Sequence, residues 1–236
     1  MITKETKVIT QNDLSEGLVL LIDKEKSKTS FDIIREVRRI LSIKKVGHSG
    51  TLDPMATGLL ILCTGRKTKE IYKYQNMTKV YEGTIKLGAT TPTMDAEGEI
   101  ENEKSYASIS KEQIDLTRKL FIGRIKQIPP MYSAIKHKGK SLYKYARKGI
   151  EIKREPREVN INRFVINDIN LPDVKFTIEC SKGTYIRVLA NDFGKELGCG
   201  AYLSELRRTA IGEYSVSDAL TTDELKTIET FSLEMV

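Results

Sequence analysis

Asp53 is a candidate catalytic carboxylate. It lies in the segment Gly47–Pro54, which is rich in turn formers and is expected to be a loop. Pro54 restricts the backbone of Asp53 to extended conformations, and loops on a rigid scaffold often carry catalytic groups. Taken alone, an Asp-Pro pair is more typical of an ordinary turn. An ionised carboxylate at this place could act as a nucleophile or as a base.

Two elements are expected to position this loop. Apolar residues recur at helical spacing over 31–41 and predict a helix that Thr29 or Ser30 can cap. The apolar run Leu59–Leu62 predicts a buried strand after the loop. Asp53 is therefore expected to lie between a helix and a strand.

The remaining pattern predicts a mixture of strands and helices. Residues 1–16 are polar and are expected to be a loose lead-in. Strands are predicted at Val19–Ile22, at Tyr81–Leu87, and around Val159–Ile166 and Val174–Cys180. Helices are predicted at Thr68–Gln75, from the capping box at Ser110 to about Leu120, from about Ile186 to just before Gly198, as a short turn at Leu203 and Leu206, and after the capping signal at Thr221. Such a mixture favours an α+β domain around a mixed sheet.

Composition and charge narrow the class of protein. The chain has 236 residues and a net charge of +7. An excess of positive charge favours a polyanionic partner, because each neutralised phosphate releases counterions, although many soluble proteins are mildly basic. The segment 123–152 is strongly basic and also carries tyrosines. It fits either a solvated charged hairpin or a surface for RNA loops.

Cysteines, histidines and apolar runs argue against several other classes. Cys63, Cys180 and Cys199 are scattered, which disfavours a disulfide framework or a zinc site and fits a reducing cytosol. We expect them to pack as small apolar groups. His48 and His137 are the two histidines, too few for a His-rich metal site. The N-terminus lacks the apolar stretch of a signal peptide, and no apolar run is long enough to span a bilayer.

The longer string around Asp53 adds a family resemblance. The fourteen residues Gly47–Leu60 resemble the signature loop of the TruB-type pseudouridine synthases. Other motifs of that family are similar to Ile22–Lys24 with Thr29 and Ser30, and to Lys79–Gly83, Gln127–Ala134, Gly139–Tyr143, Cys180–Arg187 and Leu206–Thr209. The resemblance covers roughly residues 17–215, nearly the whole chain.

The resemblance implies a role for five side chains. Asp53 is expected to be the catalytic aspartate, and Arg187 is expected to pair with it. Tyr81 is expected to stack on the target uracil and is a candidate for removing the final proton. Tyr185 is expected to line the pocket. His48 is expected where the flipped-out nucleotide is exchanged with the T-loop stack.

Further residues are expected to contact the substrate. Lys24 and Leu206 belong to matching motifs. The segment 123–152 is expected to be an inserted clamp that closes on the RNA. Its expected contacts are Tyr132, Lys136, Tyr143 and Arg147.

The resemblance also implies a reaction and an architecture. We expect isomerisation of uridine 55 in the tRNA T-loop to pseudouridine, within one domain over 1–236 that has the pseudouridine synthase fold, a mixed and mostly antiparallel sheet flanked by helices. The uracil is detached and rejoined through carbon without a redox change, so neither a cofactor nor a metal is expected. The uridine must be flipped out of folded RNA to be reached. A cytoplasmic monomer that binds no membrane is expected.

Two departures and two alternatives accompany this interpretation. About twenty residues follow Gly212, too few for the C-terminal PUA domain of many relatives, so we expect a short form or a truncated sequence. Pro92 stands where many relatives have Asp, whereas Asp95 is retained.

A tRNA-binding or tRNA-folding protein is the alternative function from another class. The same chemistry on another RNA with a T-loop-like hairpin is the second.

Overall fold

The chain packs as two compact units in the computed structural model, which describes residues 1–231. Unit 1 comprises Met1–Val80 together with the chain from Arg207 onward, and unit 2 comprises Tyr81–Leu206. Two strands, β5 (Lys79–Leu87) and β11 (Ala201–Ile211), contain the boundaries between the units. The expectation of one domain over 1–236 stays a prediction.

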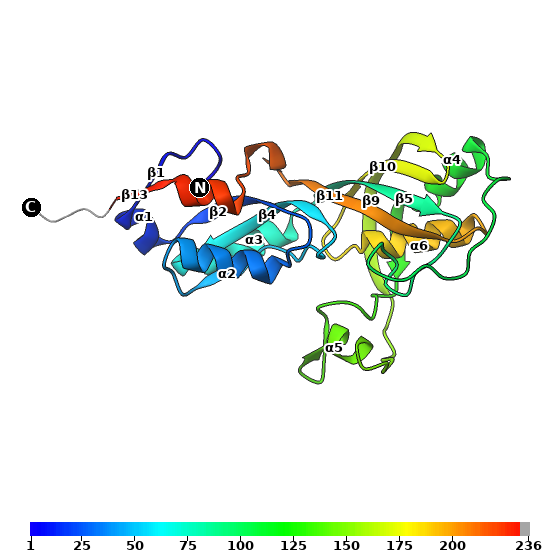
Figure 1. The fold of residues 1–236 in the computed structure, drawn as a ribbon, viewed down its shortest axis with the longest axis horizontal. Coiled ribbons are helices and arrows are strands. Elements are labelled where there is room, and N and C mark those ends of the chain that lie inside the picture. The colour runs from blue at the N-terminus through cyan, green and yellow to red at the C-terminus, as the bar shows by residue number, and fades with distance from the viewer. Residues whose placement is uncertain (232–236) are drawn as a thin grey trace, which may run out of the picture. The chain divides into compact units, whose positions relative to one another are not determined.

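Unit 1 is built on β4 (Figure 1). The elements of unit 1, in chain order, are β1 (Val8–Thr10), α1 (Gln11–Glu16), β2 (Val19–Lys24), α2 (Ser30–Ile40), β3 (Val46–His48), β4 (Thr57–Thr64), the 3₁₀ helix Gly65–Glu70, α3 (Ile71–Asn76), β12 (Tyr214–Ser215), the 3₁₀ turn Val216–Asp218, α7 (Thr222–Thr227) and β13 (Glu229–Phe231). Strands β2 and β3 pair antiparallel with β4, whereas the end of β11 pairs with it in parallel. Because β3 and β4 are neighbours, the loop that carries Asp53 leaves and re-enters the same sheet.

The core of unit 1 lies on both faces of β2 and β4. On one face Leu20 and Leu60 pack with Ile33, Ile34 and Val37 of α2. The other face packs against α3. Burial on both faces explains why these strands read as continuous apolar runs rather than alternating ones.

Residues 1–16 are ordered, so the expectation of a loose lead-in was wrong. Ile2 and Ile9 are 5% and 0% exposed. Ile2 forms a bridge with Leu20, β1 pairs with β13, and Thr10 caps α1 with a capping box. Two isoleucines in a polar stretch give no periodic pattern, and Ile9 pairs with Thr230, which lies far along the chain.

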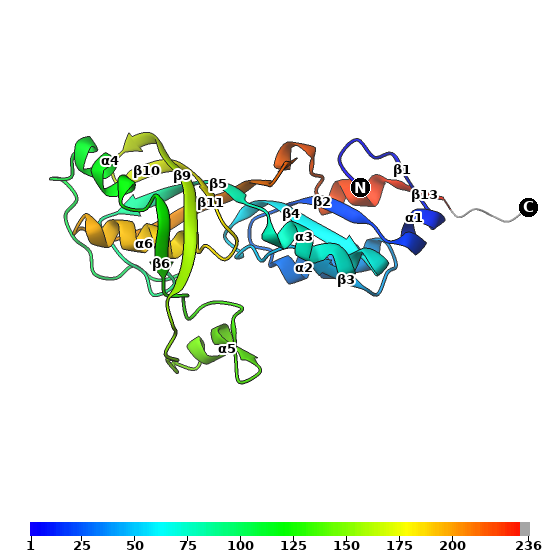
Figure 2. The same cartoon turned by 180° about the vertical axis from the view of Figure 1, so that it is seen from behind.

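Unit 2 is a sheet with the order β11, β5, β10, β9, β6. Its further elements are α4 (Lys111–Lys119), β6 (Gly123–Gln127), β7 (Lys136–His137), β8 (Lys140–Ser141), α5 (Leu142–Ala146), β9 (Arg157–Asn170), β10 (Asp173–Cys180) and α6 (Ile186–Glu196). The ring of Phe193 on α6 lies 5.9 Å from that of Phe164 on β9. Helix α6 therefore covers one face of this sheet (Figure 2).

Residues 201–211 form a strand, so the helical turn expected at Leu203 and Leu206 was wrong. Their spacing of three suggested a helix, but Ala201, Tyr202 and Leu203 are all buried. A strand that is buried on both faces does not alternate between apolar and polar residues. The α+β fold with a mixed, mostly antiparallel sheet is confirmed.

Candidate functional site

The loop with Asp53 is fixed by hydrogen bonds on both sides of that residue. Ser30 Oγ accepts from the Leu52 amide at 2.9 Å and donates to the Leu52 carbonyl at 3.2 Å. Behind Asp53, the Ser27 amide donates to the Pro54 carbonyl at 2.8 Å. Asp53 itself is half-buried. Fixing the backbone before and after a half-buried carboxylate gives it a defined direction, which a catalytic group requires.

Lys24 also holds the loop that carries Asp53. Its side chain is fully buried, and Nζ donates to the carbonyls of Glu25 at 2.8 Å, Lys28 at 2.7 Å and Pro54 at 3.4 Å. A buried ammonium needs such partners, because desolvation otherwise disfavours its charge. These bonds make Lys24 an anchor of the loop, and its contact with substrate stays a prediction.

His48 ends β3 and begins this loop. Its Nδ1 accepts from the Gly50 amide at 3.2 Å. Burial lowers the pKa of His48, and the positive charge of Arg208 lowers it further. Both influences favour the neutral form of the imidazole.

Arg187 is a predicted site residue of unit 2 that several contacts hold in place. It lies in the first turn of α6 and is 5% exposed. Its guanidinium donates to the carbonyl of Tyr132 at 2.5 Å and to that of Thr93 at 3.4 Å, and it lies 3.9 Å from the carboxylate of Asp95. These contacts fix a positive charge at one place in unit 2.

Asp95 and Gln127 support this site and were not predicted for it. Asp95 is 1% exposed and accepts from the Thr93 hydroxyl at 2.6 Å. Gln127 holds Tyr185 at both backbone groups: it accepts from the amide at 3.0 Å and donates to the carbonyl at 3.2 Å. The sequence could have indicated Asp95 and Gln127, because both lie in segments that resemble the family.

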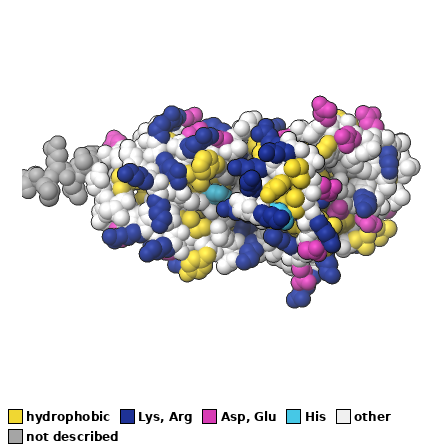
Figure 3. Space-filling model, turned by 90° about the horizontal axis from the view of Figure 1, so that it is seen from below, with side chains coloured by type: hydrophobic (Ala, Val, Ile, Leu, Met, Phe, Trp, Pro, Cys, Tyr) yellow, Lys and Arg dark blue, Asp and Glu magenta, His cyan; other side chains and the backbone are white. Residues whose placement is uncertain are grey.

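The clamp segment gathers aromatic and cationic side chains. In Figures 1 and 2 the part around α5 stands away from the sheet of unit 2. The rings of Tyr132 and Tyr143 meet edge to face at 6.1 Å, and the Arg147 guanidinium lies 5.4 Å from the Tyr143 ring centre. Lys136 is exposed on β7. Figure 3 looks onto the face from which this segment projects, and Lys and Arg side chains stand out over it.

The predicted residues belong to both units. Asp53, His48 and Lys24 lie in unit 1, and the others lie in unit 2: Tyr81, Tyr132, Lys136, Tyr143, Arg147, Tyr185, Arg187 and Leu206. Tyr81 is 9% exposed at the start of unit 2, and Leu206 is half-buried at its end. Within unit 2 the structure brings Arg187 to Tyr132. The pairing of Arg187 with Asp53 stays a prediction.

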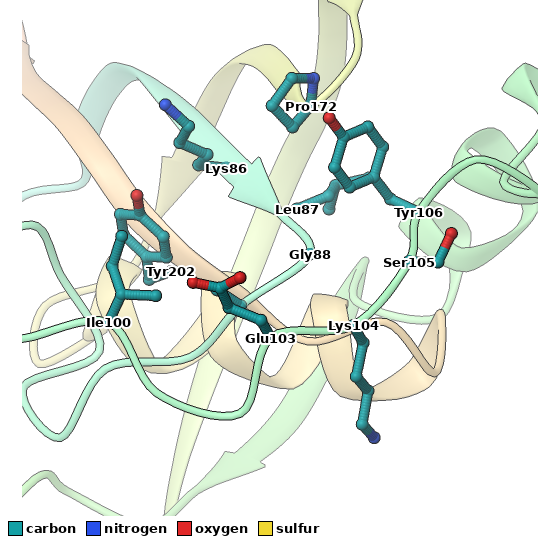
Figure 4. Close-up of a pocket in the computed structure, with 11 residues that line it drawn as sticks. Lys86, Leu87, Gly88, Ile100, Glu103, Lys104, Ser105, Tyr106, Pro172 and Tyr202 are labelled. Atoms are coloured by element: carbon teal, nitrogen blue, oxygen red, sulfur yellow. The ribbon is translucent and has the colours of Figure 1, made fainter.

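A pocket of about 440 Å³ lies elsewhere in unit 2 (Figure 4). It opens between the end of β5, the segment 100–106 and Pro172, beside the ring of Tyr202. None of its lining residues is a predicted site residue. In Figure 4 the Lys104 side chain points away from the hollow. Across residues 1–231, no three His, Cys, Asp or Glu side chains gather as a metal site requires, and no helix is long and apolar enough to cross a membrane.

Comparison with known proteins decides the family. Residues 38–186 match the TruB family pseudouridylate synthase (N terminal domain), and residues 187–234 match the tRNA pseudouridylate synthase B C-terminal domain. The chain belongs to the TruB family. Pseudouridylate synthases are isomerases, so this TruB-family chain is an enzyme of that class.

Three curated relatives, each named tRNA pseudouridine synthase B, illustrate the similarity. The protein of Opitutus terrae is 45% identical over 89% of this chain and 87% of its own length, and that of Flavobacterium johnsoniae is 46% identical over 90% and 96%. The protein of Geotalea uraniireducens is 44% identical over 87% of this chain, which spans 66% of that relative.

Solved structures support the fold of this TruB-family chain. A chain in the crystal structure of a Cbf5-Nop10-Gar1 complex is 28% identical, with a TM-score of 0.67 over 86% of this chain and 52% of its own length. A chain in an H/ACA RNP bound to a substrate RNA containing 2'-deoxyuridine is 25% identical, with a TM-score of 0.64 over 87% and 50%. This chain therefore spans about half of each. The expected pseudouridine synthase fold is confirmed.

Proposed function

We propose that this chain converts uridine 55 in the T-loop of tRNA to pseudouridine, with Asp53 as the essential carboxylate. The observation that carries the proposal is a half-buried Asp53 whose neighbours Leu52 and Pro54 are held by buried groups. This geometry lies within the motif Gly47–Leu60 of a TruB-family chain. The relatives named tRNA pseudouridine synthase B support tRNA as the substrate.

The chemistry requires an exposed nucleotide and an ionised carboxylate. The uridine is flipped out of the T-loop, and the aromatic face of Tyr81 replaces lost stacking, worth roughly 1–3 kcal/mol per base. The bond between N1 and C1' breaks, the uracil turns, and C5 bonds to C1'. C5 then loses its proton, for which Tyr81 is the proposed relay, and N1 gains a proton, so the isomerisation moves one hydrogen from C5 to N1 overall. Asp53 acts as the nucleophile or the base of this sequence.

Positive charge serves two purposes in this proposal. Arg187 is the proposed partner cation of Asp53, because a nearby guanidinium favours the ionised carboxylate. The exposed Lys136 and Arg147 are proposed to meet phosphates, and Tyr132 and Tyr143 the bases of the T-loop. No redox change occurs, so the proposed reaction uses neither a cofactor nor a metal. We further propose that the chain acts as a monomer in the cytoplasm, where tRNA is available.

The test is pseudouridine mapping on unmodified tRNA. The purified chain is incubated with tRNA transcript, with and without EDTA, and pseudouridine is located by carbodiimide treatment and primer extension. We expect a stop at position 55 with the wild type in both buffers and none with Asp53→Asn. The matched control is Asp168→Asn, on strand β9 of unit 2. Product with Asp53→Asn, or a stop at another position alone, would contradict the proposal.

The alternatives give different outcomes in the same experiment. Tight tRNA binding without product from the wild type would favour the RNA-binding protein. Improved tRNA folding with both wild type and Asp53→Asn would show that binding is a function in itself. Product on a T-loop-like hairpin of another RNA, with none on tRNA, would replace the substrate and keep the chemistry.

A further inference from the structure

Arg208 is the largest of the nearly fully buried side chains in the described part of the chain. It is 1% exposed. Its Nε donates to the carbonyl of Leu59 at 2.7 Å, and Nη2 donates to the carbonyl of Gly50 at 3.2 Å. Burying a guanidinium is costly unless its N–H groups are satisfied. Its bonds therefore tie the first strand after the proposed catalytic loop to the loop itself.

The backbone of Arg208 is placed by a close approach of two strands. Arg208 lies opposite Gly58 where β11 pairs in parallel with β4. Gly58 has φ of +102°, and a Cβ on it would lie 2.3 Å from the carbonyl oxygen of Arg208. Only glycine permits this approach. The backbone of Arg208 is therefore fixed in position, and this determines where its guanidinium meets the Gly50 carbonyl.

Gly50 links Arg208 to His48. The Gly50 carbonyl accepts from Arg208, and the Gly50 amide donates to Nδ1 of His48 at 3.2 Å. A ring nitrogen that accepts a hydrogen bond carries no proton, so the single proton of the neutral imidazole is on Nε2. An imidazolium would set its own Nδ1–H against the Gly50 amide. Burial, the largest influence, and the charge of Arg208 lower the pKa of His48 on balance, against a raising influence of the Gly50 backbone.

We propose that Arg208 is a positioning residue that, through Gly50, holds His48 as the neutral tautomer with its proton on Nε2. Since His48 is expected to meet the exchanged nucleotide, the inference rests on the proposed function. It adds how His48 would act there: as an uncharged ring for stacking, with one N–H donor for an RNA oxygen. His48 then contributes to recognition by stacking and one hydrogen bond, not by ion pairing with phosphate.

The tautomer can be read directly because the chain has two histidines. His137→Gln leaves His48 alone, and long-range ¹H–¹⁵N correlation on ¹⁵N-histidine-labelled protein without RNA distinguishes the two ring nitrogens. We expect a protonated Nε2 and an unprotonated Nδ1 at pH 7. Arg208→Lys keeps the positive charge but loses the planar guanidinium, which donates to the carbonyls of Leu59 and Gly50 from two different nitrogens. In this variant we expect a mixture of tautomers. A charged ring, a protonated Nδ1, or an unchanged spectrum in Arg208→Lys would overturn the proposal.

The neighbouring arginine is the matched control. Arg207 forms two bonds with Asp23, at 3.1 and 2.6 Å, so Arg207→Lys should leave the His48 spectrum unchanged. If Arg207→Lys gives the same mixture of tautomers, the effect of Arg208 is general loosening and the proposal fails. Backbone amide spectra of each variant verify that it is folded.

A second measurement separates this inference from the proposed function. With tRNA, we expect Arg208→Lys to raise KM about three- to tenfold, the loss expected for one hydrogen bond, with a smaller effect on kcat. A changed tautomer with unchanged KM would overturn the link to RNA. Failure of the wild type to make pseudouridine, with the neutral tautomer intact, would instead overturn the proposed function and leave the positioning by Arg208 standing.

Discussion

Lys24, Arg187 and Arg208 are buried cations that donate to backbone carbonyls. Lys24 reaches Pro54, Arg208 reaches Gly50, and Arg187 reaches Tyr132. A carbonyl fixed by a buried charge holds its peptide in one orientation. These side chains therefore act on the backbone of proposed site segments, in addition to any contact with RNA.

The carboxylate of Asp95 should matter through Arg187. Asp95→Asn removes the negative charge 3.9 Å from the guanidinium while keeping its size and an oxygen for the Thr93 hydroxyl. We expect kcat for pseudouridine formation to fall by about ten- to a hundredfold, with less change in KM, since a charge-assisted contact is worth about 1.5–3 kcal/mol. Steady-state kinetics on tRNA transcript measure both values.

The control for Asp95 is Asp115→Asn, whose half-buried carboxylate on α4 pairs with Arg118 and Lys119 of the same helix. It should leave kcat within twofold. An equal loss in both variants would show a general effect on unit 2, and an unchanged kcat in Asp95→Asn would contradict a role for the Asp95 charge.

The elements that the sequence predicts well are those with local causes. Ser110 caps its helix with the expected capping box, and the expected caps at Thr29, one of two candidates, and at Thr221 are also capping boxes. A cap and its partner lie three residues apart, so the pattern contains the whole interaction. The buried cysteines were predicted equally well, because their small apolar character is their own property.

What the sequence could not predict depends on distant partners. Arg208 reads as a surface charge, yet it is buried against Gly50, which is 158 residues away. Asp53 could be chosen because its motif resembles a family, whereas the groups that hold its loop follow from pairing of β2, β4 and β11. No local periodicity records that pairing.

Ser110 gives a direct test of a cap in unit 2. Its hydroxyl accepts from the Gln113 amide at 3.2 Å, so Ser110→Ala leaves that amide without its cap. We expect the free energy of unfolding to fall by about 0.5–2 kcal/mol. Urea unfolding followed by circular dichroism measures it. Ser108→Ala, at an exposed position just before the helix, should change it by less than half as much; equal losses would contradict the role of the cap.

At the scale of the whole molecule, net charge connects the chain to its proposed substrate. With a charge of +7, binding to tRNA should weaken steeply with salt. Lys136→Ala should weaken binding and reduce the slope of log K against log salt by about 1, because one phosphate contact is lost. Fluorescence anisotropy at several salt concentrations measures the slope. The matched control is Lys195→Ala on α6, which should leave it unchanged; a parallel reduction would show that only total charge matters.

Unit 1 is discontinuous along the chain, since all of unit 2 is inserted between Val80 and Arg207. A ribosome therefore synthesises every residue of unit 2 before it completes unit 1. Until Arg208 has left the exit tunnel, the Gly50 carbonyl of a nascent chain has no buried guanidinium to accept from. The proposed catalytic loop thus acquires its anchor only after the whole of unit 2 has been synthesised, so a nascent chain that ends before Arg208 is expected to be inactive.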